Sequence, residues 1–193
     1  NSNGFGNAHV TLGSKVSAYP NGTYTITYGA LSSTAIDANV TTPFTVGSKN
    51  LNTSFAGIIK GTGALTKTGT SIWTINNANT YTGATSIDAG SLLIENTTGS
   101  ATGTGNVTVK ANALLGGTGT VSGSVIVQAN GSISVGSTSV TGTMNIGTQL
   151  SVAGGGFLVA KVNADNNTSD VINVTGTTNV AGAVLKISKL SGT

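Results

Sequence analysis

The residues that could carry acid–base chemistry are few in this chain, and they do not gather. Asp88 and Glu95 lie seven residues apart on either side of Gly90, and His9 is the single histidine. Hydrolysis of a glycosidic bond needs two carboxyl groups facing one groove. A polysaccharide lyase needs a strong base beside a charge-neutralising group, and the chain has no arginine to supply one. We therefore predict no catalytic residues, no cofactor and no enzymatic activity.

A polar segment near the C-terminus carries oxygens of the kind that bind Ca²⁺, in the order Asp165-Asn166-Asn167-Thr168-Ser169-Asp170. An EF-hand loop needs glycine at its sixth position and glutamate at its twelfth, where this chain has Asp170 and Gly176. Asx-rich segments also form solvated turns without any metal. We predict such a turn and no metal site, with Asp165, Asn167 and Asp170 as the ligands of the alternative.

Two further residue types suggest binding chemistry. The rings of Trp73 and Tyr81 are candidates for stacking on a sugar. The glycines of 117–123 are spaced roughly as in a dinucleotide-binding loop, but that loop must lead into a helix, and no helical pattern follows. We interpret these glycines as turn residues.

The charge distribution argues against nucleic-acid binding. The net charge of +3 comes from eight lysines that are spread along the chain without forming a run. Nucleic-acid-binding proteins cluster Lys and Arg on one surface. No segment reaches the ~18 apolar residues of a transmembrane helix, so we expect neither a nucleic-acid partner nor a membrane span.

The elements that must position these residues are short strands. Charged residues make up 7% of the chain, Gly, Thr, Ser and Asn dominate the rest, and runs such as Val107-Thr108-Val109 alternate apolar with polar residues. A repeat of about 20 residues is visible, because Ile87-Asp88-Ala89-Gly90 returns at 109–112 and at 127–130. Such a period is typical of stacked solenoid coils.

The repeat predicts an all-β fold, a single right-handed parallel β-helix (β-solenoid) of about nine or ten rungs. We expect one continuous solenoid over 1–193, with weakly matching rungs at 1–56, the repeat motif at 57–136 and further rungs at 137–193. Val107, Val109, Val125, Val127 and Ile133 should point inward. A β-sandwich is the alternative, because its short strands give similar turn spacing.

Residues 61–94 contain Gly61-Thr-Gly63-Ala-Leu65-Thr-Lys67, then Ala78-Asn79-Thr80-Tyr81-Thr82-Gly83, then Ala89-Gly90-Ser-Leu92. This pattern resembles the autotransporter-associated β-strand repeat. The resemblance implies a parallel β-helix on the outer surface of, or secreted by, a bacterium with an outer membrane. It also implies that Tyr81 packs within the repeat, whereas Trp73 departs from the motif and is the better ligand candidate.

We therefore expect an adhesin shaft or a head-to-tail fibre subunit, with a glycan- or receptor-binding module on one β-face as the alternative and a polysaccharide-degrading β-helix enzyme as a third. Residues 1–12 look like the middle of a repeat, and the last residues remain strand-like. Open rungs at both ends would pair with a second copy or with neighbouring rungs of a longer passenger. Proline at Val184 should then block pairing by removing a backbone donor.

Overall fold

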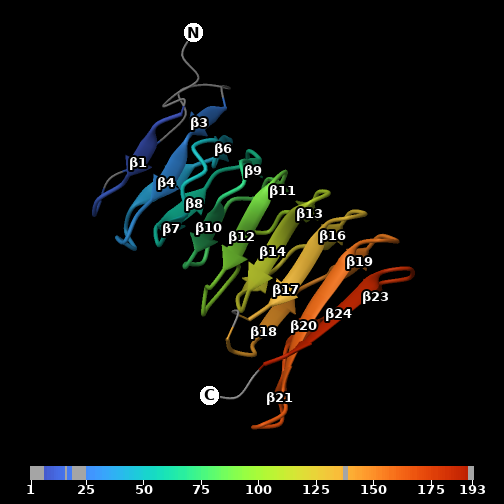
Figure 1. Cartoon of the computed structure of the whole chain (residues 1–193). Coiled ribbons are helices and arrows are strands. Elements are labelled where there is room, and N and C mark those ends of the chain that lie inside the picture. The colour runs from blue at the N-terminus through green and yellow to red at the C-terminus, as the bar shows by residue number, and fades with distance from the viewer. Residues whose placement is uncertain (1–6, 16, 19–24, 137–138, 191–193) are drawn as a thin grey trace.

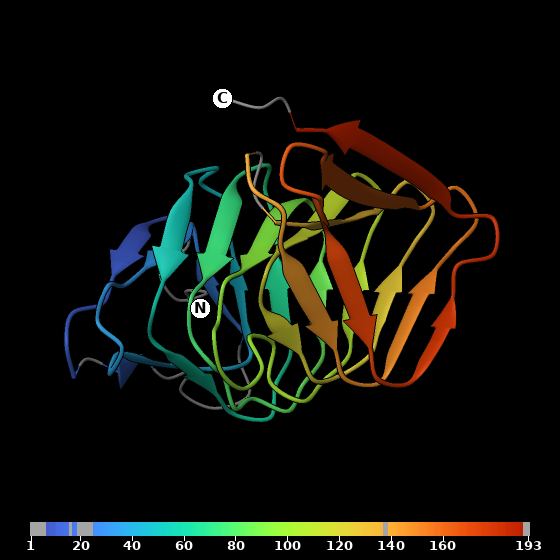
Figure 2. The same ribbon diagram turned by 90° about the horizontal axis from the view of Figure 1, so that it is seen from below.

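The computed structural model describes residues 7–15, 17–18, 25–136 and 139–190, which form strands and turns without any helix. The strands lie side by side in rungs that are stacked along one axis (Figures 1 and 2). In the described part of the chain, the strand ladders between rungs are parallel; an isolated antiparallel bridge joins Gly117 and Gly136, and the antiparallel pairing of β20 with β21 lies within one hairpin. The prediction of an all-β parallel β-helix is confirmed, and the β-sandwich alternative is wrong.

Two long sheets form two sides of the solenoid. Sheet 1 stacks eight strands: β3 (Ile26–Tyr28), β6 (Phe44–Val46), β9 (Leu65–Lys67), β11 (Thr85–Ile87), β13 (Val107–Val109), β16 (Val125–Val127), β19 (Gln149–Val152) and β23 (Thr177–Asn179). Sheet 2 contains β7 (Thr53–Phe55), β10 (Ile72–Ile75), β12 (Gly90–Ile94), β14 (Ala113–Gly117), β17 (Ser132–Val135), β20 (Phe157–Asn163), β21 (Thr168–Ser169) and β24 (Val184–Lys189).

The third side is a sheet only toward its two ends. The N-terminal part pairs β2 (Ser17–Ala18), β5 (Asn39–Thr41) and β8 (Ile58–Lys60). The C-terminal part pairs β15 (Thr120–Val121), β18 (Thr143–Ile146) and β22 (Val171–Val174). A further pair, β1 (His9–Thr11) with β4 (Ala30–Ser32), extends sheet 2 through a parallel bridge between Ser33 and Phe55.

The rungs are fewer than the nine or ten that we predicted, and the solenoid has about seven turns. In sheet 1 the register places Val107 over Thr85 and under Val125, so successive rungs are 22 and 18 residues long there. Toward the C-terminus, Val125 pairs with Leu150 and Leu150 with Thr178, which are steps of 25 and 28 residues. Longer turns and a hairpin absorb these extra residues, so fewer rungs fit into the chain.

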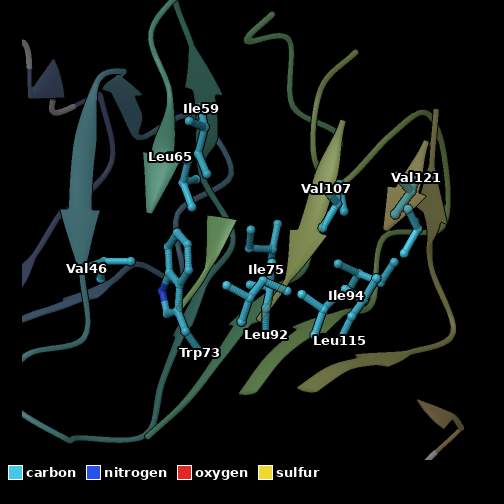
Figure 3. Close-up of a cluster of buried hydrophobic side chains, with 14 of the residues drawn as sticks. Val46, Ile59, Leu65, Trp73, Ile75, Leu92, Ile94, Val107, Leu115 and Val121 are labelled. Carbon is cyan, nitrogen blue, oxygen red and sulfur yellow. The ribbon is translucent and has the colours of Figure 1, made fainter. Parts of the chain in front are cut away.

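The interior is a continuous column of apolar side chains (Figure 3). Because side chains alternate along a strand, Val107 and Val109 point inward while Thr108 points outward. Ile87, Val109 and Val127 stack in one ladder, as the repeat predicts. All five residues that we predicted to face inward are fully buried: Val107, Val109, Val125, Val127 and Ile133.

One corner, between sheet 1 and sheet 2, repeats the same backbone conformation from rung to rung. A residue with φ between 61° and 77° occupies it in six successive rungs: Gly69, Gly90, Asn112, Asn130, Gly155 and Gly182. Glycine and asparagine are the residues that adopt this left-handed conformation at least cost. At Gly69 a Cβ atom would also lie 2.1 Å from the carbonyl oxygen of Gly47. Gly69, Gly90, Gly155 and Gly182 are therefore corner residues.

Candidate functional site

Trp73 lies inside the solenoid, and only 1% of its surface is exposed. It alternates with Ile72 along β10, so it faces inward together with Ile75 (Figure 3). Its indole Nε1–H donates a hydrogen bond to the carbonyl oxygen of Leu31 at 3.0 Å. The ring packs edge-on against Phe44, with centroids 6.1 Å apart. The indole is thus a core residue, and the expectation that it stacks on a surface ligand is wrong.

Tyr81 is also fully buried, so its ring cannot stack on a ligand either. Its hydroxyl hydrogen-bonds to Oγ1 of Thr85 at 2.6 Å, and burial raises the pKa of the phenol. The packing role that the resemblance implies for Tyr81 agrees with this position. Neither aromatic candidate provides a binding surface.

The Ala-Asn-Thr-Tyr segment of the motif occupies the third side where no strand is formed. The side chain of Asn79 adds hydrogen bonds to both neighbouring rungs. Its Oδ1 accepts a hydrogen bond from Ile59 N at 2.7 Å, and its Nδ2 donates to Ala101 O at 2.6 Å. Since Ile59 and Ala101 belong to the preceding and the following rungs, one asparagine side chain joins three rungs. The backbone N–H groups of Asn79 and Thr80 also donate to Ser100 O and Ile59 O, so the motif side chain adds to backbone bonds between rungs that no regular strand provides here.

Lys67 is a motif residue whose location we did not predict. Its side chain is fully buried, in the inward column between Val46 and Ile87. Its ammonium group donates to the carbonyl oxygens of Thr68 and Gly69 at 2.8 and 3.1 Å, and to that of Ala89 at 3.2 Å. Burial lowers the pKa of Lys67 to about 8. Because Lys67 lies two residues after the inward-facing Leu65 along β9, the periodicity already indicated its inward direction.

The metal candidates do not converge on one site. Asp165 and Asn167 are exposed in the turn that follows β20, where the backbone N–H of Asp165 donates a hydrogen bond to Oδ1 of Asn163. The Asp170 carboxylate is buried and points instead to Lys161, whose ammonium lies 2.6 Å away. It also accepts hydrogen bonds from the backbone N–H groups of Gly142 and Lys161. The described residues contain no cluster of three or more His, Cys, Asp or Glu side chains.

The acids that we considered for catalysis are separated by a whole strand. Asp88 precedes β12 and Glu95 follows it, so they lie at opposite ends of this strand. Partial burial opposes ionisation of Asp88, but the Lys110 ammonium at 2.8 Å and the Ser86 hydroxyl hold its pKa below the usual value. Glu95 accepts a hydrogen bond from the Thr118 hydroxyl at 2.7 Å. The pair has no common groove in which two carboxyl groups could act on one substrate.

The C-terminal rung leaves the interior of the solenoid open. Leu185 and Ile187 of β24 are 59% and 64% exposed. A hollow of about 290 Å³ opens beside them, and its walls are mainly apolar side chains of the last rungs, including Leu158, Ile172 and Val180. Among the described strands, β22, β23 and β24 each pair with a neighbour on one long edge only, namely with β18, β19 and β20. The apolar interior of the solenoid is therefore not covered by the described residues at this rung.

The N-terminal rung is described only in part. Of the segment that we expected to form an open rung, residues 4–6 lie outside the described residues. His9–Thr11 forms β1, which pairs with β4, and Leu12 is buried. The strands β1, β2 and β3 stand at the N-terminal edges of their ladders.

The backbone N–H of Val184 does not face the open edge, as our prediction for a blocking proline required. Its N–H donates to Gly156 O at 2.8 Å, toward the preceding rung. In parallel strands the backbone groups of successive residues point to opposite neighbours, so the N–H groups of Leu185 and Ile187 face the open edge. Proline at Val184 would break the chain's own ladder, and a proline intended to block docking belongs at Ile187.

Comparisons with known proteins agree with this architecture. Residues 65–94 match the passenger-associated-transport-repeat family. The chain is also 37% identical over 109 residues to the adhesin BmaC autotransporter of Brucella suis biovar 1 (strain 1330), an alignment that covers 53% of this chain and 3% of that protein. No solved structure matches. Within the described residues no helix is long and apolar enough to cross a membrane. The predicted resemblance to autotransporter passenger repeats is thereby confirmed.

Proposed function

We propose that this chain is a non-enzymatic section of the shaft of an extracellular, adhesin-type protein, exposed at the surface of a bacterium with an outer membrane. The single observation that carries the proposal is the open C-terminal rung, where the described strands of all three sides end on unpaired edges around an apolar hollow. Such a rung is stable in water only when something covers it. Another parallel rung is the surface that fits, because it continues every ladder in register.

The similarity to part of a far longer autotransporter adhesin supports this assignment. In a long passenger, the covering rung comes from the same polypeptide. In the isolated chain, a second copy would supply it, with β1, β2 and β3 stacking on β24, β22 and β23. This head-to-tail contact is heterologous and does not close on itself, so it produces open filaments. A fibre subunit is therefore the second candidate function, and it uses the same surface.

Light scattering over a range of protein concentrations tests the proposal. We expect the average mass of the parent chain to increase with concentration. Ile187→Pro should keep the mass at that of the monomer, because it removes an edge-facing N–H and an exposed apolar side chain from the contact. Asp165→Ala, in an exposed turn outside the three edges, is the control and should associate like the parent.

A parent chain that stays monomeric throughout would overturn the proposal. So would an Ile187→Pro variant that associates as readily as the parent. A far-UV spectrum unchanged by the substitution shows that the inner rungs of the variant are folded.

A further inference from the structure

The outer face of sheet 2 carries a column in which apolar residues and serines alternate from rung to rung. The register of the strands stacks the column in the order Ile72, Ser91, Leu114, Ser132 and Phe157. Adjacent strands of a sheet are 4.7–4.9 Å apart, so the serines recur roughly every 9.6 Å along the axis. Each serine is a low position between two larger side chains.

Two adjoining hollows, of about 530 and 490 Å³, lie over this column. Both include Ser91, Leu114 and Ser134, and their volumes are in the range of small-molecule sites, about 300–1,000 Å³. The floor is low because Gly116 and Ser134 stand in the neighbouring outward column. The face is therefore grooved parallel to the solenoid axis.

The groove offers hydroxyl groups that have no protein partner. Ser91, Ser132 and Ser134 are partly exposed, and their hydroxyls make no hydrogen bond to the described part of the chain. Ile72 is 38% exposed and Leu114 is partly exposed, so apolar surface is available beside each hydroxyl. This combination of apolar surface and free hydroxyl groups matches the two kinds of surface that a sugar ring presents.

The charge of the groove is positive. The described residues that line the two hollows include two lysines, Lys161 and Lys186, and no Asp or Glu. Lys161 is neutralised by Asp170. The Lys186 ammonium lies 3.6 Å from the centroid of the Phe157 ring, which holds it at the C-terminal end of the groove. A carboxylate would find a cation there and no repelling charge.

We infer that this face binds an extended acidic polysaccharide, aligned with the solenoid axis. The two-rung repeat of serines is about the length of one disaccharide in an extended chain. Sugar faces would lie on Ile72 and Leu114, their hydroxyls would reach Ser91 and Ser132, and a uronate carboxylate would pair with Lys186. A peptide strand is the poorer fit, because β-augmentation needs a sheet edge and this surface is the face of a sheet. The inference does not depend on the shaft assignment.

Biolayer interferometry with immobilised hyaluronan, polygalacturonate and alginate tests the inference, with cellohexaose as the neutral probe. We expect the parent to bind at least one acidic polysaccharide and to bind it more weakly as salt is raised. Ser132→Leu fills the groove and should weaken binding roughly tenfold or more, about 1.4 kcal/mol. Lys186→Gln should weaken it several-fold. Ser151→Leu is the matched control on the outer face of sheet 1, and its binding should equal that of the parent.

Failure of all three acidic polysaccharides to bind would overturn the inference. Equal binding of the neutral probe, or binding that Ser132→Leu does not weaken, would overturn it as well. Thermal melts of Ser132→Leu and Ser151→Leu distinguish loss of the groove from loss of the fold. Lys186→Gln removes the charge without adding bulk to the groove and so gives an independent reading of the same site.

Discussion

At the scale of single residues, neighbours along one strand of the solenoid differ sharply in environment. Val127 is fully buried, whereas Ile126, one residue earlier, is 39% exposed on the outer face. The alternation of strand side chains is the cause. This difference makes each strand a source of matched pairs of substitutions, one inside and one outside, with the same change in chemistry.

We predict that Val127→Asp lowers the free energy of unfolding by several kcal/mol, because it buries a carboxylate that has no partner. Ile126→Asp is the matched control and should change it by about 0.5 kcal/mol or less. Urea unfolding followed by circular dichroism measures both. Equal midpoints for Val127→Asp and the parent would show that Val127 is not in the core.

Lys67 makes stability depend on pH. Its pKa is about 8 in the folded chain and 10.5 when the side chain is solvated, so the unfolded chain binds more protons between these values. The free energy of unfolding should therefore rise from pH 8 to pH 10.5, by up to roughly 3 kcal/mol. Below pH 8, Lys67 is protonated in both the folded and the unfolded chain, so it contributes no pH dependence there. Urea titrations at pH 7.5 and 10 measure the difference. Lys67→Met should lack this rise, and an identical rise in parent and variant would contradict the assignment.

At the scale of elements, the corner between sheet 1 and sheet 2 fixes where each rung turns. Asn112 and Asn130 have φ values of 62° and 61°, and their backbones are joined by a 2.8 Å hydrogen bond from Asn112 N to Asn130 O. This corner is repeated in glycine elsewhere in the stack. Side chains that resist positive φ should therefore be excluded from it.

We predict that Asn112→Gly retains the parent's stability to within about 0.5 kcal/mol, because glycine accepts the left-handed conformation. Asn112→Val should cost about 1–2 kcal/mol, because a β-branched residue is strained at this φ. Gln128→Val, at an exposed position with no positive φ, controls for the introduction of valine. The corner assignment would be wrong if both valine variants unfolded at the same denaturant concentration.

The hairpin of β20 and β21 is anchored to the preceding rung by a buried ion pair. The Lys161 ammonium contacts Asp170 and the carbonyl oxygen of Val135. Asp170→Ala should cost roughly 3–5 kcal/mol, because it leaves a buried ammonium without its counter-charge. The double variant Lys161→Met/Asp170→Leu should lose less. Asp165→Ala, in the exposed turn, should melt with the parent, and a melt of Asp170→Ala that coincides with it would contradict this account.

The sequence predicted the elements best where the repeat is regular. Ile87, Val109 and Val127 occupy the same position of a repeated sequence motif, so the repeat predicts that they stack. The alternation of apolar and polar residues predicts that they point inward. Trp73 and Lys67 were harder, because residue type suggested the surface while alternation indicated the interior. The sequence did not predict the hairpin between Asn163 and Thr168, because this insertion interrupts the repeat and carries no recognisable sequence motif.

At the scale of the whole molecule, each rung is stabilised mainly by its two neighbours, so the ends differ from the middle. In the middle, both faces of a rung are covered and the inward-facing apolar side chains are buried. At the C-terminal end, β24 has six residues paired with β20 and a mostly exposed opposite edge. The candidate surfaces follow from this geometry: the end supports stacking of another rung, and the outer face of sheet 2 supports binding along the axis.

The surface properties at this scale could not be read from composition. The low charge content indicated little repulsion between copies, but the sequence did not show which backbone groups face the open edge. Along β24 the backbone N–H groups point alternately to β20 and to the open edge. The N–H of Val184 points to the preceding rung and that of Ile187 to the open edge, so a proline that blocks docking belongs at Ile187. The groove on sheet 2 likewise depends on register between distant strands, which a list of residues does not contain.

Negative-stain imaging of the purified chain at increasing concentration tests the central claim most directly, that the open C-terminal rung accepts another parallel rung. The account predicts short rods at low concentration that join end to end into longer rods of the same width. Ile187→Pro should remain as short rods under the same conditions. Particles that stay short in the parent at every concentration, or that associate side by side and grow wider instead of longer, would contradict it.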